Sequence, residues 1–227
     1  MTVAPKKALG QHFLVDENIV GVIGRLSALE PNDVVLEVGP GLGVLTRYLA
    51  DHVRLVHAIE VAALSPAPTK LVANLPYNIA TPLVVETLEH AASLDRWCVM
   101  VQREVADRFF ATPRTKSYGA VSVLVQLAAR KVGFHPVPPT VFRPRPRVDS
   151  ALVAFERAPV ASIAEVRLIV EAAFAHRRKT LANSVDLAGL VERARAEDAL
   201  ASIGRSNRVR AEELEPTEFV RLAELLR

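Results

Sequence analysis

Apolar positions along the first two-thirds of the chain alternate between helical and strand spacing. The helical pattern of residues 17–29 begins directly after Asp16, a side chain suited to cap the N-terminus of a helix. Further segments follow in turn, with strands expected at 34–39, 55–59, 70–73 and 96–102 and helices at 44–50 and 81–91. Strands that alternate with helices pair in parallel and are covered on both faces, so this order predicts an α/β fold.

The pattern changes near Glu156, because only helical spacing remains from residue 160 onward. This predicts a first domain at 1–157 and a small all-helical domain at 158–227. The expected core residues of the second domain are Phe174, Leu181, Leu187, Leu190, Ala199 and Leu222. Residues 136–146 hold five prolines, which excludes a regular helix there. Aromatic and basic side chains are interleaved in this segment, so we expect an ordered loop with a function.

Composition narrows the class of protein. The chain has 227 residues, of which 50% are hydrophobic and 23% charged, and no apolar run approaches the 18 residues of a membrane span. The N-terminus lacks the pattern of a signal peptide, so we expect a cytoplasmic protein without a membrane partner. Cys98, the only cysteine, lies in an apolar run and is expected to be a buried structural thiol. The six histidines have no metal-ligand spacing, so no metal site is expected.

Residues 36–43 carry a glycine-rich turn between an expected strand and an expected helix. The G-x-G-x-G spacing lets the backbone approach a nucleotide-type cofactor, although a tight strand-to-helix turn would show the same residues. Glu37 at the strand end suits the ammonium of an amino-acid moiety, and Glu60 ends the next strand, where a carboxylate can bind both ribose hydroxyls. An NAD-binding turn would more often have a glycine where this chain has Leu45.

The segment Asn74-Leu75-Pro76-Tyr77 follows the next expected strand. An amine conjugated to a purine ring is a poor nucleophile, so a site that methylates it must orient the amine. The Asn74 side chain and the Leu75 carbonyl, held by the Leu75-Pro76 linkage, can accept its two N–H groups. The Tyr77 ring can stack on the base, an interaction worth about 1 to 3 kcal/mol in single-strand sites. By itself this tetrapeptide could also be a turn after a strand.

Five segments together resemble the bacterial 16S rRNA adenine N6,N6-dimethyltransferases, and the resemblance spans nearly the whole chain. They are residues 7–14, 37–43, 74–78, 137–150 and 174–184. The related Erm enzymes, which modify 23S rRNA, share the first three. The resemblance implies a Rossmann-like methyltransferase domain that uses S-adenosylmethionine, followed by a helical domain. The implied product is two adjacent N6,N6-dimethyladenines near the 3′ end of the small-subunit rRNA.

The resemblance also assigns roles to residues of both sites. Gln11, His12 and Leu14 would cover the methionine end of the cofactor, although the family more often has Asn at the position of His12. The turn would bind the cofactor through the backbone of Gly39 and Gly41, and Glu60 would bind the ribose. Asn74 would bridge cofactor and target, with Tyr77 on one face of the base and Phe142 on the other.

Two basic clusters resemble the rRNA-facing surface of that family, which would contact phosphates without reading sequence. They are Arg143, Arg145 and Arg147 in the proline-rich segment, and Arg177, Arg178 and Lys179 in the helical domain. The second cluster could instead hold the two domains together. We expect the partner to be 16S rRNA in the small ribosomal subunit and the protein to be a monomer.

One interval departs from the family. Only 13 residues separate Glu60 from Asn74, whereas the family has a helix, a strand and an acidic residue that contacts the cofactor adenine there. A parallel crossover usually needs a dozen or more residues, so we do not expect the strand before Asn74 to return to the same sheet. Either the segment has been deleted, or the numbering crosses a break, which a Cα separation of Val61 and Ala62 well above about 3.8 Å would show.

Three functions therefore stay open. The first is the small-subunit rRNA dimethyltransferase, and the second is an Erm-type 23S rRNA methyltransferase. The segments 137–150 and 174–184 favour the first. The third is a ribosome-assembly factor that keeps the fold without catalysis, which a true deletion before Asn74 would suit.

Overall fold

The computed structural model describes residues 13–14, 16–40, 43–59, 66–77 and 79–227. Its contacts divide the chain into two compact units, one of Met1–Ala106 with Arg130–Arg157 and one of Asp107–Ala129 with Ala158–Arg227. The chain crosses between the units three times, and the last crossing, between Arg157 and Ala158, lies at the expected boundary. The segment Asp107–Ala129, which the sequence pattern assigned to the first domain, clusters with the C-terminal helices instead.

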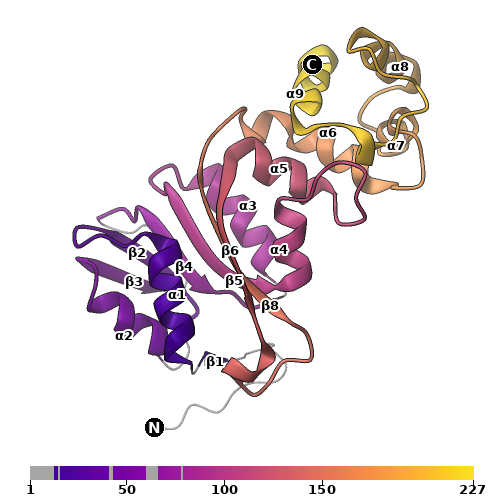
Figure 1. Ribbon diagram of the computed structural model, residues 1–227. Coiled ribbons are helices and arrows are strands. Elements are labelled where there is room, and N and C mark those ends of the chain that lie inside the picture. The colour runs from indigo at the N-terminus through magenta and orange to yellow at the C-terminus, as the bar shows by residue number, and fades with distance from the viewer. Residues whose placement is uncertain (1–12, 15, 41–42, 60–65, 78) are drawn as a thin grey trace. The chain divides into compact units, whose positions relative to one another are not determined.

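The first unit is built on a six-stranded sheet in the order β3-β2-β4-β5-β8-β6 (Figure 1). Its strands are β2 (Val34–Val38), β3 (Leu55–Ile59), β4 (Lys70–Asn74), β5 (Arg96–Gln102), β6 (Ala129–Val137) and β8 (Ser150–Arg157). The first four pair in parallel, and β8 runs antiparallel to β5. The expected parallel sheet is confirmed, with antiparallel β8 added to it.

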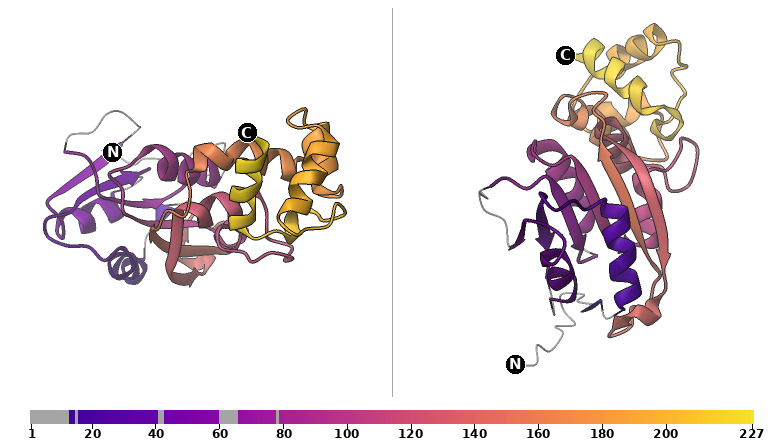
Figure 2. Two further views of the ribbon diagram at one scale, coloured as in Figure 1. Left: turned by 90° about the horizontal axis from the view of Figure 1, so that it is seen from above. Right: turned by 60° about the vertical axis from the view of Figure 1, so that its left-hand side comes forward.

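Helices cover both faces of this sheet (Figure 2). Cys98 on β5 contacts the Ile23 carbonyl of α1 (Glu17–Ser27), whereas its neighbour Trp97 donates a hydrogen bond to Thr87 of α3 (Ala80–His90). Successive side chains of a strand point to opposite faces, so α1 and α3 lie on opposite sides. The shorter α2 (Val44–Ala50) contacts β3 and α1.

Local signals explain where α1 begins and ends. The Asp16 carboxylate accepts hydrogen bonds from the backbone N–H groups of Asn18 and Ile19, which confirms the expected N-cap. At the other end Ala28 adopts a left-handed conformation with φ of 48°, and its N–H bonds to the Arg25 carbonyl. The buried face of α1 packs on the apolar core of the sheet, which contains Cys98. Burial raises the pKa of the Cys98 thiol to about 11, as expected of a structural cysteine.

The crossover from β3 to β4 corrects a prediction. Both strands pair in parallel with β2, so the chain does return to the same sheet, although only ten residues separate the two strands. The crossover must span two strand spacings of about 5 Å each and return along a strand of about 17 Å. Ten extended residues can reach about 33 Å, which is enough. Two hydrogen bonds hold the end of this crossover against the sheet. One joins the His57 ring and the Pro66 carbonyl, and in the other the Thr69 N–H donates to the Val34 carbonyl. A dozen residues are needed only where a helix must fit.

A second, two-stranded sheet joins the N-terminal segment to the proline-rich segment. In it β1 (Phe13–Leu14) pairs antiparallel with β7 (Phe142–Arg143), and Leu14 lies opposite Phe142. The 3-10 helix η2 (Pro139–Val141) directly precedes β7. Residues 136–146 are therefore ordered without an α-helix, as their prolines predicted.

The second unit contains helices around an aromatic core. Its elements are α5 (Ala120–Ala128), α6 (Ile163–Ala175), α7 (Leu181–Leu187), α8 (Arg193–Ser202), η3 (Ala211–Glu213) and α9 (Pro216–Leu226), while α4 (Arg103–Phe109) crosses the boundary between units. Phe174 packs against the rings of Tyr118 and Phe219 at centroid distances of 5.9 and 5.8 Å. The buried Tyr118 hydroxyl donates a hydrogen bond to the Leu214 carbonyl. Segment 107–129 thus supplies part of this core.

Some expected core residues of this unit are exposed. Leu181, Ala199 and Leu222 are buried as predicted, but Leu187 and Leu190 are 60% and 38% exposed. Leu187 is the last residue of α7, and the chain turns away there, so helical spacing no longer sets which side faces the core. Among the described residues, no helix combines the length and the apolar character needed to cross a membrane.

Candidate active site

The glycine-rich turn leaves the carboxyl end of β2 and enters α2. Gly39 and Gly43 both have a φ of +76°, a backbone conformation that side chains with a Cβ rarely adopt. The Gly43 N–H bonds to the Pro40 carbonyl at 2.8 Å, and Gly43 is the N-cap residue of α2. The sequence places a third glycine, Gly41, between them, and it lies outside the described residues. The turn is therefore tight and glycine-dependent, as expected of a backbone that approaches a ligand.

The two motifs predicted from the sequence lie next to each other. A Cβ added at Gly39 would be 3.8 Å from the Asn74 carbonyl oxygen and 4.0 Å from Cδ of Pro76. The strands explain this closeness, since β2 and β4 are neighbours and both motifs follow their carboxyl ends. The structure thus brings the glycine turn and the Asn74–Tyr77 segment together at one edge of the sheet.

Glu37 is a buried acid at this edge. Only 1% of the residue is exposed, and neither its Oε2 nor the Thr46 hydroxyl has a hydrogen-bond partner within the described part of the chain. Burial raises the pKa of Glu37, and the nearby Thr46 hydroxyl offsets part of that rise without satisfying the carboxylate. A buried carboxylate oxygen without a donor is costly, and a cationic ligand would supply what it lacks.

The Asn74–Tyr77 segment forms the turn between β4 and α3. The Leu75 N–H bonds to the Met100 carbonyl at 3.1 Å, which extends the pairing of β4 with β5 by one residue. The Pro76 carbonyl accepts the N–H groups of Ile79 and Ala80 and so begins the helix. Leu75 is buried, whereas Asn74 and Tyr77 are partly exposed. Backbone hydrogen bonds on both sides thus fix the path of the chain that carries Asn74 and Tyr77.

Tyr77 makes a contact that the sequence did not reveal. Its hydroxyl lies 2.8 Å from the Ser150 hydroxyl, at the start of β8 and 73 residues away in the chain. Burial raises the pKa of Tyr77, and the hydrogen bond with Ser150 offsets part of the rise. The only sequence signal for Ser150 is a polar residue directly before the apolar run Ala151–Phe155.

Phe142 and Leu14 are buried side by side in the core. Phe142 is 1% and Leu14 6% exposed, and the two residues are partners in the β1–β7 pair. The Phe142 ring would have to be uncovered before a base could stack on it, so its assigned role stays a prediction. Gln11, His12 and Glu60 lie outside the described residues, and their assigned contacts with a cofactor stay predictions as well.

The two basic clusters differ in their surroundings. Arg143, Arg145 and Arg147 are all exposed. The Arg177 side chain has partners within the helical unit. Its guanidinium donates hydrogen bonds to the Tyr118 carbonyl at 3.1 Å and to the Glu212 carboxylate at 3.3 Å. Arg178 and Lys179 are exposed, and no ion pair or hydrogen bond involves their side chains among the described residues. The last two are thus available to a partner, whereas its hydrogen bonds favour a structural role for Arg177.

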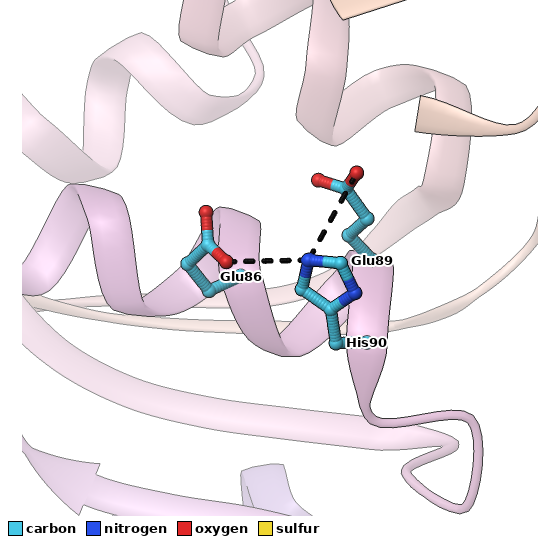
Figure 3. Close-up of side chains that lie close together, drawn as sticks. All are labelled: Glu86, Glu89 and His90. Carbon is cyan, nitrogen blue, oxygen red and sulfur yellow. Dashed lines mark ion pairs between the residues drawn. The ribbon is translucent and has the colours of Figure 1, made fainter. Parts of the chain in front are cut away.

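Within the described ranges, one group of side chains has metal-ligand spacing. Glu86, Glu89 and His90 converge on the last turn of α3, with His90 Nε2 at 3.4 Å from Glu86 and 4.0 Å from Glu89 (Figure 3). Glu86 and His90 are exposed, with 52% and 68% of their side chains accessible. An i,i+4 ion pair at a helix C-terminus accounts for this geometry.

Similar folds occur in solved methyltransferases. A dimethyladenosine transferase from Plasmodium falciparum superposes with a TM-score of 0.78 at 22% identity, over 93% of this chain and 96% of that one. The 23S rRNA methyltransferase ErmE superposes with a TM-score of 0.67 at 26% identity, over 94% of this chain and 99% of that one. The fold is therefore that of the Rossmann-like methyltransferases, as the resemblance implied.

Sequence comparison defines the family. The profile described as ribosomal RNA adenine dimethylase matches residues 4–64 and 65–227. A Rubrobacter xylanophilus protein named ribosomal RNA small subunit methyltransferase A is 46% identical over 97% of this chain and 95% of its own length. The chain belongs to the ribosomal RNA adenine dimethylase family.

The comparisons also bear on the short crossover. The family match is interrupted between residues 64 and 65, in the segment between β3 and β4. The alignment with the Rubrobacter protein runs over 253 positions, 26 more than the 227 residues of this chain. The sequence is thus shorter than its relatives, and the interrupted match lies in this crossover. Val61 and Ala62, whose separation would reveal a break, lie outside the described residues.

Proposed function

We propose that this chain transfers methyl groups from S-adenosylmethionine to N6 of two adjacent adenines near the 3′ end of 16S rRNA, during maturation of the small ribosomal subunit. The observation that carries the proposal is the closeness of Gly39 in the glycine turn to Asn74 and Pro76, which a Cβ at Gly39 would contact. Methyl transfer requires the donor and the acceptor to meet in line, and the closeness of the two turns supports a cofactor at the first and the target amine at the second.

The residues at the glycine turn fit S-adenosylmethionine. The orphaned Glu37 carboxylate suits its ammonium group, and the left-handed Gly39 lets the backbone approach the ligand. Gln11, His12 and Leu14 would enclose the methionine end, Gly41 would complete the turn, and Glu60 would bind the ribose. When bound, the cofactor supplies a methyl group that its sulfonium already activates, so the protein needs no strong general base.

The residues after β4 suit the target adenine. The Asn74 side chain and the Leu75 carbonyl would accept the two N–H groups of the amine and direct its lone pair at the methyl group. The base would stack on Tyr77, with Phe142 on its other face. Burial raises the pKa of Tyr77, so its hydroxyl stays neutral around pH 7 and does not act as a phenolate base.

The exposed basic residues suit contacts with rRNA phosphates. We assign this role to Arg143, Arg145 and Arg147 in the proposed catalytic domain at 1–157, from which segment 107–129 clusters with the other unit, and to Arg178 and Lys179 in the proposed helical domain at 158–227. Arg177 was part of the second cluster, but its bonds to Tyr118 and Glu212 favour a structural role. The name of the Rubrobacter relative supports the small subunit as the substrate. We further propose that the protein is a cytoplasmic monomer that needs no metal.

Labelled S-adenosylmethionine offered with undermethylated small subunits, large subunits and naked rRNA tests this function. We expect label on two adjacent adenines of small-subunit rRNA. Label confined to large-subunit rRNA would replace the proposal with an Erm-type activity. Tight binding of small subunits without any label would favour an assembly factor, in which the short β3–β4 crossover no longer allows the cofactor to bind.

A further inference from the structure

A hydrogen bond joins the target-base turn to a strand that is distant in the sequence. The Tyr77 and Ser150 hydroxyl oxygens are 2.8 Å apart. Ser150 is 1% exposed, so its hydroxyl is shielded from solvent. A buried hydroxyl needs a partner, and Tyr77 provides it.

The position of Ser150 is fixed by backbone pairing. It lies opposite Gln102 in the antiparallel pair of β5 and β8, and the adjacent Asp149 carbonyl accepts the Arg103 N–H at 2.9 Å. The same strand β5 also holds the turn that carries Tyr77, through the bond from Leu75 to Met100. Both partners of the hydroxyl contact are thus tied to one central strand.

Ser150 also interrupts an apolar pattern. Side chains of β8 alternate between faces, so Ser150 shares a face with Leu152 and Ala154. Those two residues belong to the apolar core. An apolar residue at position 150 would continue that core, so the structure places a hydroxyl where packing alone does not require one.

We propose that Ser150 is a positioning residue, which anchors the far end of the Tyr77 side chain so that its ring meets the target base in a constant place. The inference rests on the proposed function of Tyr77. The tyrosine hydroxyl lies on the long axis of the ring, and a hydrogen bond there fixes the direction of that axis. Stacking depends on ring placement, so the anchor acts on the base through Tyr77 and not by contact with it.

A double-mutant cycle in turnover tests the coupling. Ser150→Ala and Tyr77→Phe should each lower kcat by about threefold to tenfold, the effect of one neutral hydrogen bond, with little change in KM for RNA. The double variant should be no slower than either single variant, because both changes remove the same bond. Ser27→Ala is the matched control, since Ser27 is equally buried and its hydroxyl bonds to the Ile23 carbonyl in α1. Additive losses, or an equal loss in the control, would overturn the proposal.

A second readout does not depend on methyl transfer. RNA with 2-aminopurine at the target position reports stacking through its fluorescence. We expect strong quenching with the wild-type chain and with Ser27→Ala, weak quenching with Tyr77→Ala, and an intermediate signal with Ser150→Ala. Ser150→Thr keeps the hydroxyl and should restore quenching. Equal quenching by Ser150→Ala and wild type would refute the anchoring role. A wild type that quenches the probe but transfers no methyl group to the same RNA with adenine at that position would contradict the proposed function and leave the anchor supported.

Discussion

On one face of the sheet, the polar side chains at the amino ends of the parallel strands differ in their surroundings from those at the carboxyl ends. Strand register puts one set of polar residues at the amino edge of the parallel strands and another at the carboxyl edge, with the apolar core between them. At the amino edge Lys70 bonds to Asp33 at 2.6 Å, and Arg96 bonds to Glu156 and to the Leu26 carbonyl. Each of these charges has a partner within the protein.

The carboxyl edge contains Glu37, Asn74, Gln102 and Ser150 on that face. Here Glu37 keeps a buried oxygen without a hydrogen-bond partner in the described part of the chain, and Asn74 lies beside the glycine turn. Under the proposed function, polar residues at the amino edge stabilise the fold, while those at the carboxyl edge bind ligands or, like Ser150, position a residue that does. Substitutions should therefore separate into losses of stability at one edge and losses of activity at the other.

The largest effect is expected at the carboxyl edge. Asn74→Ala should lower kcat by about 100-fold to 1000-fold, because it removes an acceptor for the reacting amine, while affinity for rRNA changes little. Steady-state kinetics and RNA binding measure the two effects separately. Asn18→Ala, at an exposed position of α1, should change neither. Equal losses in turnover and affinity would contradict the assigned role.

Substitutions at the amino edge should lower stability and leave turnover unchanged. Lys70→Met should lower the free energy of unfolding by about 3 kcal/mol, because it leaves the largely buried Asp33 carboxylate without its cation, and kcat of the folded protein should stay unchanged. Urea unfolding followed by circular dichroism gives the first quantity. Arg193→Ala breaks an exposed pair with Glu197 and should cost only about 0.3 to 0.5 kcal/mol. A loss of turnover in the Lys70 variant would break the proposed division between edges.

Substitution of Glu37 should weaken cofactor binding but raise the stability of the fold at neutral pH. Glu37→Gln should weaken binding of S-adenosylmethionine about tenfold by calorimetry, since a charged hydrogen bond is lost. Burial raises the pKa of Glu37 above its ordinary value of 4.5, so the folded chain holds this proton more tightly than the unfolded chain does. Stability then falls as the pH rises from 4.5 through the raised pKa. The Glu37→Gln variant should lack this decrease in stability. If its free energy of unfolding depends on pH as that of the wild type does, Glu37 is not the group that causes the decrease.

The smallest effects are expected in the second basic cluster. Arg178→Ala and Lys179→Ala should each weaken rRNA binding and reduce the slope of log affinity against log salt by about 0.7 to 0.9. Arg177→Ala should leave that slope unchanged and lower the free energy of unfolding by about 1 kcal/mol or less, since its bonds are half-exposed. Filter binding at several salt concentrations distinguishes the three. A salt slope that changes only with Arg177 would reverse the assignment.

Sequence patterns predicted the regular elements where the signal was local. The helix after Asp16 and the segments 44–50, 55–59 and 96–102 occur as expected, because caps and apolar spacing lie within one element. Strand β8 was not predicted, since its place between β5 and β6 depends on pairing with distant segments. Strand β6 was not predicted either, because most of its side chains are only partly buried or exposed, and they give little apolar alternation.

The candidate site was predictable to the same extent. Glycine spacing and the Asn74–Tyr77 motif each follow a strand, so both could be read from short stretches of sequence. The contact of Tyr77 with Ser150 could not, because 73 residues separate them and only the pairing of β8 with β5 brings them together. The structural role of Arg177 was open for the same reason, since Tyr118 and Glu212 are far from it in the sequence.

The late position of β8 has a consequence for synthesis of the protein. This strand is the last of the sheet to leave the ribosome, yet it lies between β5 and β6. Contacts between distant segments form slowly, and a domain folds only when its strands are available. A nascent chain that ends before residue 150 carries both the glycine turn and the Asn74–Tyr77 segment but lacks the strand that completes the sheet. Such a chain should not protect β5 from hydrogen exchange, so the enzyme cannot act on ribosomal RNA until its own translation has passed β8.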